Sequence, residues 1–383
     1  MSGDYQYIDT PATLAELCAR LKGKPWIAVD TEFMRERTYY PELCLVQVAT
    51  DELVACVDPL ALPSLEPLLA VFLDERTVKV LHAARQDLEI FFHMSGKVPQ
   101  PVFDTQVAAR FLGLPDQAGY GAVVQSMLGI TLDKSHARTD WARRPLSAAA
   151  LDYAADDVRH LRNLYHKILA ELAARERGAW VEPELKALVD EKLYRPDPDN
   201  AWHRVRGVQR LKPKTLTLIK SLAAWRERTA MAENRPRQWI VKDESLMDLA
   251  KQLPCDLESL AAVRGVGESL AKRHGAELLK MLGEDGEPSA VERPTRDTPL
   301  KPEQEALVDA LNALLRLSAA RGDVSAASLA NRAELERLVR GERELQILKD
   351  WRLEMAGREL VEFLEGRLTL SAQGGALKVK PAV

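Results

Sequence analysis

Short apolar runs and helically spaced apolar positions alternate through the first half of the chain. Residues 26–29 form an unbroken apolar run, which predicts a buried strand that ends at Asp30. Further strand-like runs cover 43–49 and 53–57, with three polar residues between them as in a tight hairpin, and 78–82. Helical spacing is expected in six segments: 13–21, 65–72, 88–93, 105–112, 121–128 and 147–172. This mixture predicts an α/β domain over residues 1–195, with helices covering a mixed sheet.

The rest of the chain shows helical patterns interrupted by polar, proline-containing segments. Residues 195–200, Arg-Pro-Asp-Pro-Asp-Asn, have the composition of a linker or turn. A second linker is expected at 284–299, which is rich in Pro, Glu and Asp. These breaks predict three parts: residues 1–195, 203–284 and 300–373.

Composition agrees with a multidomain globular protein. A chain of 383 residues is too long for one ordinary core, and 46% hydrophobic with 29% charged residues is typical of globular domains. No apolar run approaches the roughly 18 residues that a membrane span needs, and the polar N-terminus lacks a signal-peptide core. The cysteines show no metal-site spacing, so we expect a cytoplasmic protein with reduced thiols: Cys18, Cys44, Cys56 and Cys255.

Positive charge is concentrated after the first linker, although the whole chain has a net charge of −4. Residues 204–242 contain two acidic side chains, Glu227 and Glu233, and eleven basic ones: Arg204, Arg206, Arg210, Lys212, Lys214, Lys220, Arg226, Arg228, Arg235, Arg237 and Lys242. Such a local excess suits a polyphosphate partner. A solvated helix face is the alternative. We expect the tryptophans of this region to be core residues and not base-stacking platforms: Trp202, Trp225 and Trp239.

The strand that ends the first apolar run carries two carboxylates. Because side chains alternate along a strand, Asp30 and Glu32 in WIAVDTEF point to the same side. Carboxylates at the edge of a core are costly to desolvate. Acidic side chains gathered without nearby Arg or Lys indicate hard divalent cations, since oxygen ligands suit Mg²⁺ or Mn²⁺.

Two further acidic motifs follow in order. Asp87 lies in VLHAARQDLEIFF, and Asp157 lies in LDYAADDVRHL. Tyr153 precedes Asp157 by four residues, so the two side chains share one face of the predicted helix. Asp156 points about 100° away around the same helix.

Each motif also has a structural interpretation. A DxE sequence after a strand is common, and Asp87 suits the N-cap of the helix that follows. Asp157 is compatible with a solvated helix face, and Tyr153 with a core aromatic. The occurrence of all three motifs in this order favours a shared site.

Together, the three acidic motifs resemble those of the DEDD superfamily of 3′→5′ exonucleases, in the subclass with Tyr as its fifth residue. The His subclass has His five residues before the last Asp, where this chain has Asp152. The stretch DTEFMRERTYYPELCLVQVAT with HAARQDLEIFF and YAADDVRHL is most similar to the ribonuclease D family. The resemblance implies a ribonuclease H-like first domain.

The resemblance also implies a mechanism with two divalent metal ions, Mg²⁺ or Mn²⁺. Asp30 would bridge both ions, Glu32 and Asp157 would complete the nucleophile-side site, and Asp87 would support the second ion. Tyr153 would orient the attacking water. His82 is expected to be a structural or substrate-side residue and Asp104 a structural one, both outside the metal set. The products would be nucleoside 5′-monophosphates released one at a time from a 3′-hydroxyl end.

The later parts resemble small all-α bundles of the helicase-and-RNase-D C-terminal (HRDC) type. In the first, Gly265 and Gly267 form a Gly-x-Gly turn that opens a helix; such a turn offers backbone N–H groups to phosphate but also serves simple helix–helix turns. The second is expected to be a diverged copy with balanced charge and a structural or clamp role.

Three functional hypotheses follow. The favoured one is a monomeric exoribonuclease that binds RNA and trims tRNA precursors and other small structured RNAs. A DNA exonuclease of the same chemistry is the alternative, although no GxxxxGK[ST] helicase motif is present. A non-catalytic nucleic-acid-binding protein is the third, and the complete carboxylate set disfavours it.

Overall fold

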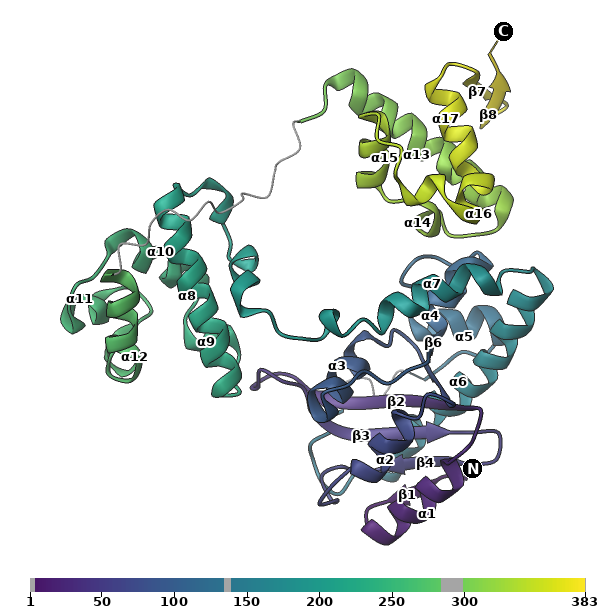
Figure 1. The fold of residues 1–383 in the computed structure, drawn as a ribbon. Helices are drawn as coiled ribbons and strands as arrows, with labels where there is room; N and C mark the ends of the chain where they lie inside the picture. Colours follow the sequence, from purple (N-terminus) through teal and green to yellow (C-terminus); the bar gives the residue numbers. More distant parts are fainter. Residues whose placement is uncertain (1–3, 134–138, 284–298, 383) are drawn as a thin grey trace. The chain divides into compact units, whose positions relative to one another are not determined.

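The computed structural model describes residues 4–133, 139–283 and 299–382, and the chain forms two compact units (Figure 1). The first unit comprises Met1–Glu32, Cys44–Leu193 and Thr298–Val383. The second comprises Phe33–Leu43 and Tyr194–Asp297. The expected linker at 284–299 lies, apart from its last residue, outside the described residues.

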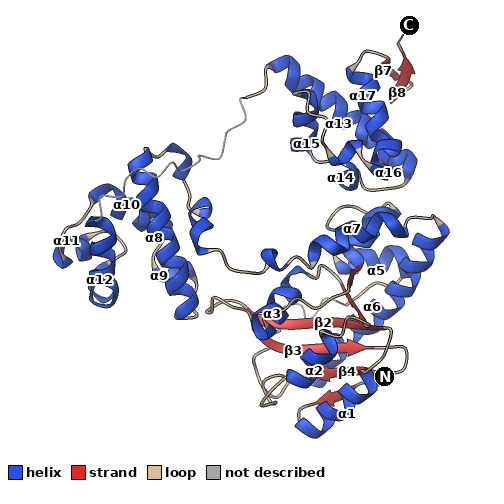
Figure 2. Ribbon diagram, in the orientation of Figure 1, coloured by secondary structure: helices blue, strands red, loops and turns tan. Residues whose placement is uncertain are grey.

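A mixed sheet forms the centre of the first unit (Figure 2). Its six strands are β1 (Gln6–Ile8), β2 (Trp26–Met34), β3 (Glu42–Ala49), β4 (Val54–Val57), β5 (Val78–Leu81) and β6 (Val102–Asp104). They are ordered β1-β4-β3-β2-β5-β6. β3 and β4 are antiparallel, as the predicted hairpin requires, whereas β5 is parallel to both β2 and β6. The expected mixed α/β sheet is therefore confirmed.

The interior position of β2 explains its sequence. With neighbours on both edges and helices around the sheet, its first four residues are buried on both faces and form a continuous apolar run. Among the described residues up to 193, the α-helices are α1 (Pro11–Leu21), α2 (Glu66–Phe72), α3 (Arg85–Ser95), α4 (Thr105–Ala109), α5 (Tyr120–Leu128), α6 (Ala148–Ala174) and α7 (Gly178–Leu188). The first six correspond to the predicted helical segments.

The first helical bundle follows in the second unit. It consists of α8 (Pro213–Ala232), α9 (Arg237–Ile240), α10 (Asp243–Gln252), α11 (Leu257–Ala262) and α12 (Gly267–Gly283). A 3₁₀ helix, Pro198–Arg204, precedes them and includes the end of the predicted linker. Trp202 and Trp225 are core residues as expected. The same expectation is wrong for Trp239, which is 54% exposed because α9 is a single turn that buries Ile240 instead.

The last region is helical but not all-α. Its helices are α13 (Pro302–Gly322), α14 (Ala326–Leu329), α15 (Arg332–Val339), α16 (Asp350–Arg352) and α17 (Arg358–Leu364), with a π-helical turn at Leu353–Gly357. They are followed by an antiparallel hairpin of β7 (Leu368–Gln373) and β8 (Ala376–Pro381). Gly374 and Gly375 connect the strands with φ of +60° and +76°, the left-handed conformation that a two-residue hairpin turn favours. The QGG sequence and the alternating apolar residues on either side of it are the features that indicate this hairpin in the sequence.

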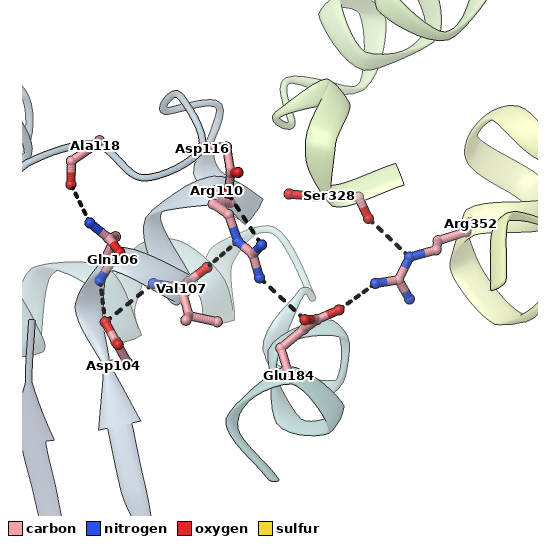
Figure 3. A network of polar contacts seen from close by, with 9 residues as sticks. All are labelled: Asp104, Gln106, Val107, Arg110, Asp116, Ala118, Glu184, Ser328 and Arg352. Carbon is pink, nitrogen blue, oxygen red and sulfur yellow. Dashed lines mark hydrogen bonds and ion pairs between the residues drawn. The ribbon is translucent and has the colours of Figure 1, made fainter. Parts of the chain in front are cut away.

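The last region packs against the exonuclease-like part of the first unit (Figure 3). Glu184 on α7 links the two: its carboxylate accepts from Arg352 Nη2 at 2.6 Å and from Arg110 Nη2 at 3.3 Å. Arg352 also donates from Nε to the Ser328 carbonyl at 2.9 Å. The Arg352 side chain is only 12% exposed, whereas that of Glu184 is 34% exposed.

Two further contacts strengthen this junction. Arg177 donates to the carbonyls of Gly322 and Asp323 where α13 ends, which satisfies oxygens that a helix terminus leaves unpaired. Trp180 stacks on Trp351 with ring centroids 4.5 Å apart and an interplanar angle of 7°. These contacts support the structural role expected for the last region.

Replacing Arg352 by Met should show how much this junction contributes to the free energy of unfolding. The change leaves Glu184 with one fewer donor and the Ser328 carbonyl without its guanidinium, so the free energy of unfolding should fall by about 1–3 kcal/mol. Thermal unfolding measures the loss. Arg358→Met is the control: Arg358 is exposed and pairs with Glu354 one turn away, so its loss should cost under about 1 kcal/mol. Equal effects of the two changes would contradict the assignment.

Each described helix is too short or too polar to cross a membrane.

Candidate active site

Three of the predicted carboxylates converge. Asp30 and Glu32 lie two residues apart on β2, and Asp157 comes from α6. One carboxylate oxygen of each lies within 4.8 Å of the others, and all three side chains are half-buried. Residues 125 positions apart in the sequence thus form one acidic cluster, which we call the carboxylate site.

The long helix α6 delivers both Asp157 and Tyr153. Ser147 begins it by accepting a hydrogen bond from the Ala150 N–H at 3.1 Å, the usual role of an N-cap serine. Its apolar face packs into the core and fixes the rotation of the helix, so that Asp157 reaches the site. Asp156 instead pairs with Arg159 at 2.7 Å on the exposed side. The choice of Asp157 over Asp156 therefore agrees with the geometry.

Asp87 is near the cluster but not within it. It is the third residue of α3, and Ala84 occupies the N-cap, so the capping interpretation of Asp87 is wrong. Its carboxylate accepts a short hydrogen bond from the Thr31 hydroxyl, although Thr31 lies between Asp30 and Glu32 on β2. Burial, followed by the charge of Asp30, raises the pKa of Asp87 well above its usual value. The carboxylate is thus held beside the site without joining the three oxygens.

Asp104 holds the start of α3. Its buried carboxylate accepts from the N–H groups of Ala83 and Ala84 at 3.0 and 2.9 Å, just before the helix that carries Asp87. The same side chain caps α4 through Gln106 N–H. His82 bonds to Thr105 and to the Ala118 carbonyl and belongs to the same framework. Both residues are placed as the structural readings expect.

The electrostatics of the carboxylate site favour protonation when no cation is bound. Burial, followed by the charges of Asp30, Asp157 and Asp87, raises the pKa of Glu32 to about 9. Burial and then Asp30 raise the pKa of Asp157 to about 8, and burial raises that of Asp30 to about 6. Carboxylates that repel one another to this degree need positive charge to ionise together at neutral pH.

The donor set fits divalent metal ions. It offers carboxylate oxygens alone, the ligands that Mg²⁺ and Mn²⁺ prefer. Within the described ranges, no Lys, Arg or His forms an ion pair with Asp30, Glu32, Asp87 or Asp157, so the chain itself does not neutralise them there. This charge deficit is the observation that favours a metal centre.

Two residues at the site escaped the sequence motifs. Thr31 is the hydrogen-bond donor to the Asp87 carboxylate, and its place inside the DTE motif is the sequence feature that could have identified it. Tyr120 at the start of α5 donates its hydroxyl to the backbone carbonyl of Asp157 at 2.5 Å. Burial, and then Asp157, raise the Tyr120 pKa well above its usual value, so the phenol stays protonated. No spacing connects Tyr120 to α6, and only packing reveals it.

The first helical bundle carries most of the basic region. Arg226 does not contribute to an outer surface, because it is 1% exposed and pairs with Asp243 at 2.7 Å. Arg204 and Arg228 are well exposed. Gly265 has a φ of +80°, and a Cβ there would lie 2.4 Å from Ser245 Oγ, so close packing accounts for this glycine. The close packing at Gly265 therefore supports the interpretation of the Gly-x-Gly sequence as a simple helix–helix turn.

Comparisons with known families agree with this division. A family described as 3′-5′ exonuclease matches residues 5–173, which include every predicted site residue. The HRDC domain family matches residues 215–282. The chain is 44% identical to ribonuclease D of Sphingobium indicum, with 96% of each chain covered. It is 42% identical to ribonuclease D of Granulibacter bethesdensis, covering 96% of this chain and 94% of that one.

A solved structure shows the same fold over nearly the whole chain. Escherichia coli RNase D, described as an exoribonuclease involved in structured RNA processing, superimposes with a TM-score of 0.79 at 31% identity. The match covers 95% of this chain and 99% of that one. The expected exonuclease fold, HRDC-type bundle and ribonuclease D-type exoribonuclease activity are thereby confirmed. This chain belongs to the ribonuclease D family.

Proposed function

We propose that this chain hydrolyses RNA from its 3′ end with two divalent metal ions and releases nucleoside 5′-monophosphates. The observation that carries the proposal is the convergence of Asp30, Glu32 and Asp157 from a strand and a distant helix, with no ion pair to them from a Lys, Arg or His of the described residues. Held by these carboxylates, two divalent ions would activate the attacking water and stabilise the leaving oxygen. As the resemblance to DEDD exonucleases implies, Asp30 would hold both ions.

The remaining residues have distinct proposed roles. Glu32 and Asp157 would hold the ion on the side of the attacking water, and Asp87 would support the second ion. The Tyr153 hydroxyl donates a hydrogen bond that orients the water. Burial, followed by the charges of Asp157 and Glu32, raises the Tyr153 pKa, so this phenol stays protonated and is no base at neutral pH.

The substrate we propose is the 3′ extension of tRNA precursors and of other small structured RNAs. The first helical bundle supplies affinity through phosphate contacts of its exposed arginines and lysines. The likeness to an exoribonuclease involved in structured RNA processing supports this choice over DNA. All the proposed site residues come from one chain, which fits a monomer.

A time course on 5′-labelled RNA and on DNA of the same sequence tests the proposal. With Mg²⁺ or Mn²⁺ we expect a descending ladder on RNA that disappears with EDTA, since the carboxylates alone cannot activate water. Thin-layer chromatography of the products should show 5′-monophosphates.

The outcomes separate the hypotheses. A ladder on DNA alone would assign the chain to DNA exonucleases of the same chemistry. Tight RNA binding with no ladder under any metal would indicate a non-catalytic binding protein.

A further inference from the structure

The segment that leaves the catalytic strand is held by the first helical bundle. Phe33–Leu43, which follows Glu32 directly, belongs to the same compact unit as that bundle. Asn234 Oδ1 accepts from the N–H groups of both Tyr39 and Tyr40, each at 3.1 Å. The Tyr39 hydroxyl donates to Glu227 Oε1 at 2.7 Å. Three hydrogen bonds thus join the segment to residues nearly 200 positions later.

The carboxylate of Glu227, which accepts the hydrogen bond from Tyr39, is buried and has two arginines nearby. The Glu227 side chain is only 2% exposed, and Arg204 and Arg237 approach the oxygen that Tyr39 contacts, at 3.6 and 3.9 Å. The Tyr39 ring packs against the apolar core of the bundle. Burial, and then the bond to Glu227, raise the Tyr39 pKa, so its hydroxyl remains a donor at neutral pH. Loss of this donor would leave a buried carboxylate with poorer compensation.

Asn234 is shaped for the second contact. It lies just beyond the end of α8, with a φ of +46°, in the left-handed region that Asn tolerates better than most residues. This turn presents the side-chain oxygen to two consecutive N–H groups of the segment. Arg35 and Arg37, earlier in the segment, are exposed.

We propose that the first helical bundle positions Glu32 for hydrolysis by holding the segment Phe33–Leu43, with Tyr39 and Asn234 as positioning residues. The inference rests on the proposed function. One peptide bond separates Glu32 from the segment, and Glu32 faces the like charges of Asp30 and Asp157. Holding the chain at Tyr39 and Tyr40, seven and eight residues after Glu32, limits how far repulsion can displace this carboxylate. The bundle therefore contributes to the rate of hydrolysis as well as to RNA affinity.

Full-length point variants test this. Asn234→Gly removes the acceptor but keeps the left-handed turn, whereas Asn234→Asp keeps an acceptor oxygen. Tyr39→Phe removes only the hydroxyl. With an RNA trinucleotide and saturating Mg²⁺, we expect kcat to fall about tenfold for Asn234→Gly and Tyr39→Phe, with KM changed less than about twofold. Asn234→Asp should restore kcat.

Limited trypsin digestion gives a second readout that does not depend on activity. Cleavage after the exposed Arg35 and Arg37 should accelerate in Asn234→Gly. The control is Asn200→Gly: Asn200 lies in the same unit and donates to Asp197, away from the segment. Its kcat and its cleavage rate should match those of the unmodified protein.

The outcomes are distinct from failure of the proposed function. An unmodified chain that does not degrade RNA would refute that function. Normal hydrolysis by the unmodified chain, with unchanged kcat and trypsin rates in both Asn234→Gly and Tyr39→Phe, would overturn the positioning role. A raised KM with unchanged kcat would also overturn it, because the segment would then serve binding alone.

Discussion

Replacing Asp30 by Asn should lower kcat for RNA hydrolysis at least about a thousandfold. The amide has nearly the same shape as the carboxylate, but it carries no charge and only one ligand oxygen. Metal-ion stabilisation of the transition state is worth several kcal/mol, and each 1.36 kcal/mol is a factor of ten in rate. Single-turnover cleavage of labelled RNA measures the loss. RNA binding should change little, because the first helical bundle supplies phosphate contacts.

The adjacent acidic pair on α6 offers a matched control. Asp156→Asn removes the same charge next to Asp157, yet Asp156 is exposed and bonded to Arg159. Its kcat should stay within about twofold of the unmodified chain. Retention of activity in Asp30→Asn, or a comparable loss in Asp156→Asn, would refute the assignment of the carboxylate site.

The metal-free protein should lose stability as pH rises from about 5 to 9, and divalent metal should restore it. The pKa values of Asp30, Asp157 and Glu32 are raised in the folded chain to about 6, 8 and 9. The folded state therefore binds more protons than the unfolded state in this range. Stability is fully present below the unfolded pKa values near 4 and declines as each group ionises.

Thermal unfolding at several pH values measures this effect. At pH 8, saturating Mg²⁺ or Mn²⁺ should raise Tm by at least about 4 °C, since a ligand that binds the folded state alone stabilises it. In EDTA, Glu32→Gln should have a flatter dependence of Tm on pH than the unmodified chain, because the neutral amide does not ionise. A Tm that is independent of metal at pH 8 would argue against a metal site here.

Hydrophobic periodicity predicts the helices and strands that bury one face, or both faces, over several consecutive residues. β2 and α6 are long, regular and packed on the core, so their periodicity is visible in the sequence. β1 and β6 have three residues each, too few to show a period. The exposed helix α7 contains Pro183 and buries only Val181, which leaves no apolar stripe.

Burial at individual positions depended on neighbours that are distant in sequence. Trp225 and Trp239 are both aromatic residues in a basic region, but α8 buries the first and the single turn of α9 exposes the second. Arg226 lies in the basic region of the sequence, but it is buried because it pairs with Asp243. A charge can enter a core only where tertiary structure supplies its counterpart.

The sequence alone determined the chemistry of this protein, since residue types and their local spacing place Asp30 and Glu32 on one side of a strand and Tyr153 and Asp157 on one side of a helix. Tertiary structure decided what surrounds them. The approach of Asp157 to β2, the bond from Thr31 to Asp87 and the attachment of the segment Phe33–Leu43 to Asn234 all join residues far apart in the chain. Local propensity cannot encode such contacts, because they arise from how separate elements pack.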